Sequence, residues 1–487
     1  MNNLFLKYQN LAELRRLIIN NVEFKGPFIY KKAFYAVINP TDFCPVGCVH
    51  CLYSSVKMKT SKVNRSQMKS FIKIANQANL KMLVFSGGGE PFENLEEMLY
   101  AIENIKSLED VIIITSAYFA KSPKITKNIL DRIYNVANKN RKKKGLKKVI
   151  ITLRISRDNA QCNIIPSQNI INIIDYFIKK ADFSNFRILI RTVLDYKENQ
   201  DLEISKKLGF FLLPLKDKND LYKDLPIIDA FPTRWIVNEN KKISIPVIYK
   251  PLYFVGRGLF NNHHNIHSLW KIIESEEKSG TLFNLCLRGA KGEGHNYYET
   301  VLKGYDFWRE KINSKLIYNT PKNKNKKNLA LYVQASGNVL INNGVPDIAI
   351  NLKNIKSWNN FLRIISEDLV QRLLVENGPF FVKDIAEEVE KDLIKRIEKT
   401  NFVFAVSLLS LETPALRLYA TIRAAQHYLK LGKIKIKNKE LEEFIIGKKD
   451  RELIGLYKKW KDLPENKKAQ ATKAKDPITA DIRSIYG

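Results

Sequence analysis

Cysteine, acidic residues and long apolar runs are all scarce in this chain, and these shortages limit what it can be. Five cysteines in 487 residues are too few for a secreted scaffold held together by disulfides. The longest apolar stretch, residues 402–411, is too short to cross a bilayer. No signal peptide is recognisable, so we expect a cytoplasmic protein that makes no membrane contact. The hydrophobic content of 45% is that of a globular protein with a sizeable core.

The shortage of acidic residues leaves a large positive charge. The chain has 81 Lys and Arg residues against 50 Asp and Glu, a formal charge of +31 at pH 7. Basic clusters lie at residues 139–148, 322–327 and 467–475, but none interleaves arginine with aromatic residues as single-strand binding surfaces do. The charge favours acidic partners, either an acidic peptide or an RNA. A general bias of composition toward Lys, Asn and Ile is the alternative explanation.

Three of the cysteines lie close together in the sequence Cys44-Pro-Val-Gly-Cys48-Val-His-Cys51. A tight loop can bring three thiolates at this spacing onto one iron–sulfur cluster. Zinc is the rival interpretation, but tetrahedral zinc usually takes two well-separated pairs of ligands, and the chain has no second cysteine pair. Three thiolates leave one iron without a protein ligand, so a substrate or cofactor can bind there.

A glycine-rich segment follows the cysteines, with the sequence Val84-Phe85-Ser86-Gly87-Gly88-Gly89-Glu90-Pro91. CxxxCxxC followed by Gly-Gly-Glu resembles the radical S-adenosylmethionine (SAM) superfamily, in which the cysteines bind a [4Fe–4S] cluster whose open iron chelates SAM. The resemblance implies SAM contacts from Ser86, Gly88, Gly89 and Glu90, and glycine allows the close backbone approach. It also implies that His50 lies against the adenine. The alternative is a surface turn and a chance group of cysteines.

Apolar strands alternate with amphipathic helices through the first half of the chain. We expect strands at residues 34–38, 81–85, 111–115, 149–155, 186–193 and 210–215. Helical periodicity separates the strands around residues 68–75, 95–102, 125–133 and 170–177. This alternation predicts an α/β fold with a parallel sheet and right-handed crossovers, which matches the partial (β/α)6 barrel of the superfamily. Cys44 and Glu90 then follow strand ends, where barrel sites are built.

Other strand ends supply further candidates for the site. Ser116 follows the third expected strand, Ser156 and Asp158 follow the fourth, and Arg191 lies in the fifth. In the superfamily a polar residue near the fourth strand often holds the SAM ribose, and a cation can meet the SAM carboxylate. An ordinary strand-end hydrogen bond, a helix cap or a solvated ion pair explains each residue equally well.

Two cysteines remain outside the cluster motif. Cys162 lies in an expected loop past the fourth strand, where it could donate a hydrogen atom to a substrate radical or simply pack as a small apolar side chain. Cys286 lies in a later segment that we expect to fold back over the barrel opening. Both are candidate catalytic thiols.

Beyond the expected barrel the sequence changes character. Residues 233–249 predict a hairpin, and Arg257 lies in a Gly-Arg element similar to one near the active site of peptide-modifying members, although an exposed turn explains it equally well. Residues 329–342 predict a second hairpin around Ser336-Gly337. Together with residues 351–355 it resembles the SPASM-like extension of peptide-maturing radical SAM enzymes. Lys353 replaces a glycine of that extension, and its auxiliary-cluster cysteines are absent, so we expect a single cluster.

These features divide the chain into consecutive ranges. They are an N-terminal helical lead-in (1–33), a radical SAM core (34–232), the SPASM-like extension (233–356), a helical region (357–465) and a mobile tail (466–487). Within the helical region, apolar periodicity predicts helices at residues 358–374, 383–398 and 402–431.

The resemblance implies an enzyme that takes an electron from an external one-electron reductant, cleaves SAM and removes a hydrogen atom from its substrate. A ribosomally made peptide or small protein is the preferred substrate, because the extension resembles that of peptide-maturing members. An RNA-modifying radical SAM enzyme is the second hypothesis, and only the positive charge favours it. The third is a non-catalytic binding scaffold, which would not need an open iron site.

Overall fold

The structure is a computed structural model of the chain. It describes residues 11–26, 32–48, 61–86, 88–157, 164–180, 185–193, 200–213, 233–237, 244–250, 328–341, 350–377, 384, 385, 388, 414–447 and 455. The chain divides into two compact units: unit 1 takes in Met1–Phe34, Trp308–Val333 and Gly337–Gly487, and unit 2 takes in Tyr35–Phe307 and Gln334–Ser336. Within the described ranges, no helix has both the length and the apolar character that a bilayer span requires. The cytoplasmic location stays a prediction.

Unit 2 is built on a parallel sheet. Its first strands are neighbours in chain order: β2 (Lys32–Ile38), β3 (Met82–Phe85), β4 (Asp110–Thr115), β5 (Ile150–Ser156) and β6 (Phe186–Val193). β9 (Ser244–Lys250) adds a sixth parallel strand beside β6. The predicted α/β fold, with six parallel strands as in a partial barrel, is confirmed.

The identity of the sixth parallel strand differs from the prediction. Of residues 210–215 the structure describes 210–213, and these contribute β7 (Phe211–Leu213), at the sheet edge and antiparallel to β8 (Thr233–Val237). β8 and β9 form the antiparallel hairpin predicted for residues 233–249. β9 lies beside β6 and buries Ile245 and Val247, whereas Phe211 of the edge strand β7 is 58% exposed.

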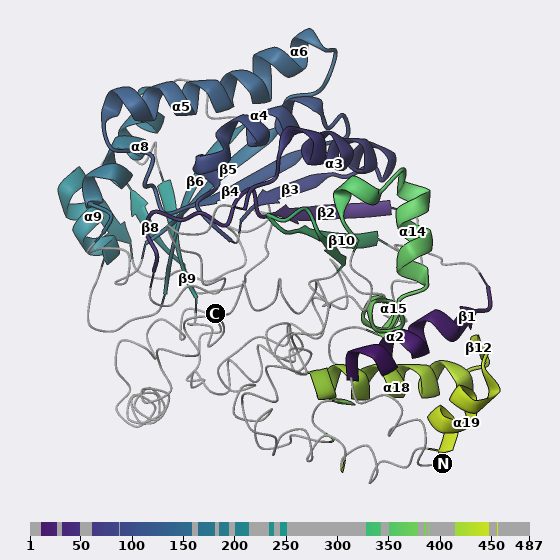
Figure 1. Cartoon of the computed structure of the whole chain (residues 1–487). Coiled ribbons are helices and arrows are strands. Elements are labelled where there is room, and N and C mark those ends of the chain that lie inside the picture. Colours follow the sequence, from purple (N-terminus) through teal and green to yellow (C-terminus); the bar gives the residue numbers. More distant parts are fainter. Residues whose placement is uncertain are drawn as a thin grey trace, which may run out of the picture. The chain divides into compact units, whose positions relative to one another are not determined.

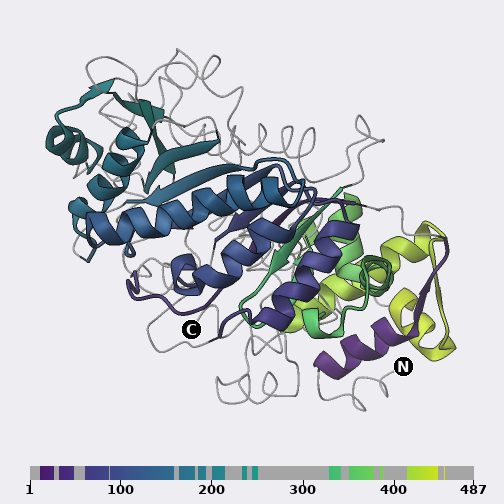
Figure 2. The same cartoon turned by 90° about the horizontal axis from the view of Figure 1, so that it is seen from above.

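Helices cover one face of this sheet, as Figure 1 shows from the side and Figure 2 from above. They follow β2 to β6 in turn: α3 (Arg65–Gln77), α4 (Leu95–Asn104), α5 (Pro123–Asn135), α8 (Ser167–Lys179) and α9 (Gln200–Leu208). Local sequence fixes where they begin, since Asn64 and Gln67 form a capping box at α3 and Ser122 caps α5 ahead of Pro123. Beneath the helices β3 is buried along its whole length, as central strands of parallel sheets usually are.

A buried arginine stabilises the end of α4. A π-helical turn, η2 (Val136–Asn140), and α6 (Arg141–Lys143) continue the line of α5 in Figure 1. Arg141 is 0% exposed, and burial lowers its pKa to about 10. Its guanidinium donates to the carbonyl oxygens of Ile102 (2.7 Å), Ile105 (2.8 Å), Lys147 (2.8 Å), Lys106 (3.3 Å) and Leu108 (3.3 Å). Arg141 therefore satisfies carbonyls that the end of a helix leaves open.

An ionic cluster joins α5 to α8. Asp131 accepts hydrogen bonds from Lys127 Nζ (2.7 Å), Tyr176 OH (2.8 Å) and Lys180 Nζ (2.8 Å). Partial burial opposes ionisation of Asp131, but these hydrogen bonds outweigh it and lower the pKa of the carboxyl group to about 2. Lys180 also lies over the ring of Tyr134, 3.9 Å from the ring centroid.

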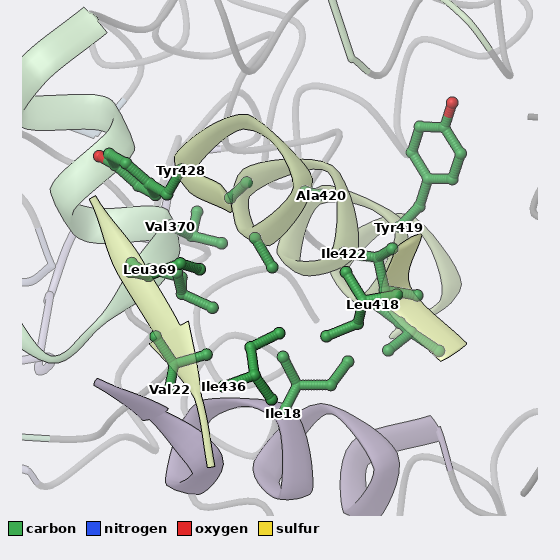
Figure 3. Close-up of a cluster of buried hydrophobic side chains, with 14 of the residues drawn as sticks. Ile18, Val22, Leu369, Val370, Leu418, Tyr419, Ala420, Ile422, Tyr428 and Ile436 are labelled. Atoms are coloured by element: carbon green, nitrogen blue, oxygen red, sulfur yellow. The ribbon is translucent and has the colours of Figure 1, made fainter. Parts of the chain in front are cut away.

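Unit 1 brings together segments that are far apart in the sequence. β1 (Val22–Phe24) pairs antiparallel with β12 (Ile434–Ile436), beside α2 (Leu11–Asn21), α15 (Leu369–Asn377), α18 (Pro414–Lys430) and α19 (Lys439–Gly447). Figure 3 shows their common hydrophobic core, which includes Ile18, Val22, Leu369, Ile422 and Ile436. The division of the chain into five functional ranges stays a prediction, but the described parts of residues 1–33 and 357–465 share this core.

The two strands of the second predicted hairpin belong to unit 1. β10 (Asn328–Val333) pairs antiparallel with β11 (Val339–Ile341), and a bridge joins Asn338 to Asn351 just before η5 (Leu352–Asn354). The single helix predicted at 358–374 is instead two, α14 (Trp358–Ser366) and α15. The break occurs at Asp368, a residue type that favours the position just before a helix. Of the other predicted helices, α18 forms within 402–431, and most of 383–398 lies outside the described residues.

Candidate functional site

The carboxyl ends of β2 to β6 meet at one edge of the sheet, because these strands are parallel. Ile38 pairs with Phe85, and Ser156 pairs with Arg191 at the last positions of their ladder. Ser86 continues the pairing of β3 with β2, since its N–H donates to the Ile38 carbonyl (3.0 Å). The predicted site residues that lie at or just after these strand ends are Cys44, Cys48, Ser86, Gly88, Gly89, Glu90, Ser116, Ser156 and Arg191.

The structure describes two of the three predicted cluster ligands. Cys44 and Cys48 follow β2, and both are half-buried. Cys51 lies outside the described residues. The same holds for the other predicted site residues His50, Cys162 and Cys286, and for Asp158 and Arg257.

Glu90 is the most buried acid of the described part of this edge, with 3% exposure. Its Oε1 accepts from Thr115 Oγ1 (2.6 Å), and its Oε2 accepts from the hydroxyl (2.6 Å) and the N–H (2.9 Å) of Ser116. Burial raises the pKa of Glu90 above its usual value, and hydrogen bonds from Ser116 and Thr115 offset part of that rise. A buried acid with a perturbed pKa at strand ends is typical of a functional site.

Ser116 makes contacts that its sequence position does not predict. The sequence suggests Ser116 as a direct SAM contact, whereas both its hydroxyl and its N–H donate to Glu90. Thr115 makes a similar bond and is missing from the predicted site, although a Thr-Ser pair directly after an apolar strand is a signal that could have found it. The next residue, Ala117, has φ of 67°, a left-handed conformation that alanine rarely adopts. Asn169 Nδ2 holds the Ala117 carbonyl at 3.0 Å and so supports this turn.

The Gly-Gly-Glu segment packs against the residues that lead into Cys44. The Gly89 N–H donates to the Thr41 carbonyl (2.5 Å), and the Glu90 N–H donates to the Phe43 carbonyl (2.9 Å). A β-carbon on Gly89 would lie 1.9 Å from the Phe43 carbonyl oxygen, and Gly88 has φ of 63°. Position 89 therefore requires glycine because its backbone lies against the Phe43 carbonyl, at the start of the cysteine loop. The sequence suggests a different reason, close approach of the backbone to SAM.

Ser156 and Arg191 are register partners on β5 and β6, and both are half-buried. Arg154 lies on the same face of β5 as Ser156, because side chains alternate along a strand. This arginine is missing from the predicted site, although the alternation in Leu-Arg-Ile-Ser could have indicated it. Arg157, also missing, is buried and donates to the Ile165 carbonyl (2.5 Å), which links the end of β5 to the residues just before α8.

Comparison with known proteins finds radical SAM enzymes. No protein-family model matches the chain. GTP 3',8-cyclase of Clostridium botulinum strain Hall is 23% identical over 323 residues, which are 60% of this chain and 91% of the relative. The probable dual-specificity RNA methyltransferase RlmN of Clostridium acetobutylicum is 28% identical over 207 residues, which are 41% of this chain and 56% of the relative. Native anSMEcpe with bound AdoMet and Cp18Cys peptide is a solved structure with 13% identity and a TM-score of 0.35, covering 82% of this chain and 99% of that chain.

The curated relatives are radical SAM enzymes, a class whose cofactors are SAM and a [4Fe–4S] cluster. The described residues fit these cofactors. Cys44 and Cys48 supply thiols, the soft donors that iron–sulfur clusters take, half-buried at the carboxyl edge of the sheet. Because the Glu90 N–H bonds to the residue directly before Cys44, the Gly-Gly-Glu segment lies next to the start of the cysteine loop.

Proposed function

We propose that this protein is a radical SAM enzyme that modifies a ribosomally made peptide or small protein. With an external one-electron reductant, the bound cluster and SAM would supply a 5′-deoxyadenosyl radical that abstracts a hydrogen atom from the substrate. The observation that carries the proposal is the pair of backbone hydrogen bonds from Gly89 and Glu90 to Thr41 and Phe43, at 2.5 and 2.9 Å. These bonds join the two motifs on which the chemistry depends.

The chain's own residues would hold and orient the cofactors. We assign the iron ligands to Cys44, Cys48 and Cys51. We assign SAM contacts to His50 at the adenine, to Gly88, Gly89 and Glu90 at the amino group, to Ser156 near the ribose, and to Arg191 near the carboxylate. We assign further SAM contacts to Ser86 and Ser116. Above its raised pKa, the Glu90 carboxylate would carry a negative charge that attracts the SAM ammonium group. Thr115 and Ser116 fix where that charge lies.

The choice of a peptide as substrate is based on the extension that follows the barrel. The antiparallel pair β10–β11 and the Asn338–Asn351 bridge support the resemblance to peptide-maturing enzymes on which this choice depends. A single cluster suits redox-neutral chemistry, such as epimerisation or a carbon-centred rearrangement. The +31 charge supports an acidic partner.

Iron stoichiometry tests the enzyme class. Reconstituted without oxygen, the protein should hold about four irons per chain, since it has a single cysteine triad. Replacing Cys44, Cys48 and Cys51 together with Ala should abolish iron binding and SAM cleavage. The matched control replaces Cys162 and Cys286 with Ala and should keep the iron. A cluster retained in the triple variant, or about eight irons per chain, would contradict the proposal.

RNA modification is the second candidate, and the similarity to an RNA methyltransferase favours it. We expect only weak RNA binding that falls by orders of magnitude between low and physiological salt, because a diffuse charge contacts phosphates without reading sequence. Fluorescence anisotropy with a labelled tRNA measures this. Submicromolar, sequence-selective binding at physiological salt would favour RNA over peptide.

A further inference from the structure

The loop that carries the cysteines is closed at its base by residues outside the cysteine motif. Thr41 and Lys62 form an antiparallel bridge. The Asp42 N–H donates to the Ser61 carbonyl (2.8 Å), and the Val63 N–H donates to the Pro40 carbonyl (2.9 Å). Thr41 Oγ1 adds a further bond to the Ser61 carbonyl (3.0 Å). We call residues 40–43 and 61–63 the loop base.

Asn94 bridges the two sides of the loop base. Its Nδ2 donates to the carbonyl oxygens of Pro40 (2.8 Å) and Val63 (2.9 Å). Asn94 is also the residue just before α4, where asparagine usually accepts a hydrogen bond from the first turn of the helix. Its side chain makes no such cap bond. The loop base, not the helix, therefore accounts for asparagine at this position.

We infer that Asn94 is a positioning residue that keeps the base of the cysteine loop closed. The inference rests on the proposed function in one respect, that this loop holds the cluster. Gly89 and Glu90 fix the Thr41 to Phe43 side of the base, and Asn94 ties that side to Val63. A base that is closed in advance lowers the conformational entropy lost when the thiols gather around iron.

The test compares Asn94→Ala with Asn76→Ala. Asn76 is a matched control because its side chain also makes two backbone hydrogen bonds, donating to the Asn104 carbonyl (3.2 Å) and accepting from the Lys106 N–H (2.7 Å). The first readout is amide hydrogen exchange at Asp42 and Val63 in metal-free protein. We expect exchange about tenfold faster in Asn94→Ala, because two hydrogen bonds across the base are lost, and no change in Asn76→Ala. Asn94→Ser, which keeps one donor, replaces the Ala variant if that variant does not fold.

The second readout is the rate at which reconstituted protein loses iron to a chelator. This rate should also rise about tenfold in Asn94→Ala and stay at the wild-type value in Asn76→Ala. Unchanged exchange at Asp42 and Val63 would overturn the closed base, and faster exchange with unchanged iron loss would overturn the positioning role. Failure of wild-type protein to bind iron would contradict the proposed function instead, and the exchange measurement would still decide whether Asn94 closes the base.

Discussion

Replacing Glu90 by alanine should loosen the end of β4 far more than replacing it by glutamine. Glu90→Ala leaves the Thr115 hydroxyl and both Ser116 donors buried without their acceptor. Each unsatisfied buried donor costs about 1 kcal/mol or more, so we expect the local free energy of opening to fall by about 3 kcal/mol. Glu90→Gln keeps an acceptor for Ser116 and removes a buried charge, so its cost should not exceed about 1 kcal/mol.

Amide exchange at Ser116 measures this local opening, because its N–H donates directly to Glu90. A local probe is needed because a chain of two units does not unfold in one step. Glu109→Gln is the control: Glu109 is 60% exposed and pairs with Lys81 at the surface, so its loss should change stability by less than about 0.5 kcal/mol. Exchange at Ser116 that is equal in Glu90→Ala and wild type would refute the hydrogen-bonded arrangement.

The same site predicts a direction of pH dependence. Burial raises the folded-state pKa of Glu90 above its ordinary value of 4.5, so the native state holds this proton more tightly than the unfolded chain. The free energy of opening near Ser116 should therefore rise as pH falls from neutrality through the raised pKa, and level off below 4.5. The glutamine in Glu90→Gln cannot titrate, so the free energy of opening of the wild type should rise relative to that of this variant as pH falls. A difference between the two that does not vary with pH would contradict this assignment.

Other substitutions test the remaining features. Arg141→Met should lower the local free energy of opening at the end of α4 by about 3–5 kcal/mol, measured by amide hydrogen exchange, because it removes the donors to buried carbonyls. The partly exposed Arg132→Met should lower it by less than about 0.5 kcal/mol. The pKa of Asp131 is about 2, against an ordinary 3.8. The ionised Asp131 carboxylate therefore stabilises the folded protein fully above pH 3.8, and this contribution is lost as pH falls toward 2. Wild type and Asp131→Asn, which should differ by about 1 kcal/mol at neutral pH, should converge over that range. Cys286→Ala should leave SAM cleavage intact and suppress solvent deuterium incorporation into an epimerised product. Unchanged product when Cys162 and Cys286 are both removed would contradict epimerase chemistry.

The sequence predicts the fold well where the signal is local. The strands β2 to β6 and the helices between them each carry their own apolar period, and Cys44 and Glu90 follow strand ends as that pattern requires. The place of β9 beside β6 is not predictable in this way, because strand order depends on pairing between distant segments. The break before α15 is missed for a different reason. Here the signal is local, a single residue, Asp368, but it lies within an apolar pattern that otherwise predicts one continuous helix.

The site shows the same limit. The motif locates Glu90, but it does not indicate that Thr115 and Ser116 bind the carboxylate. Those residues reach Glu90 because β4 pairs with β3 in the sheet. Asn94 likewise meets Pro40 and Val63 through the fold alone. A sequence pattern identifies residue types and spacing, and contacts between separate strand ends require the structure.

The pairing of β1 with β12 has a consequence for how the chain folds during synthesis. Most of unit 2 comes from the continuous stretch Tyr35–Phe307, which a ribosome releases in one piece. Ile18 and Val22 emerge before it, but their core partners Leu369 and Ile436 emerge long after it. Because domains generally fold as they are released, α2 must wait with its apolar side uncovered while unit 2 folds. The first helix of the described residues is thus among the last to reach its native surroundings.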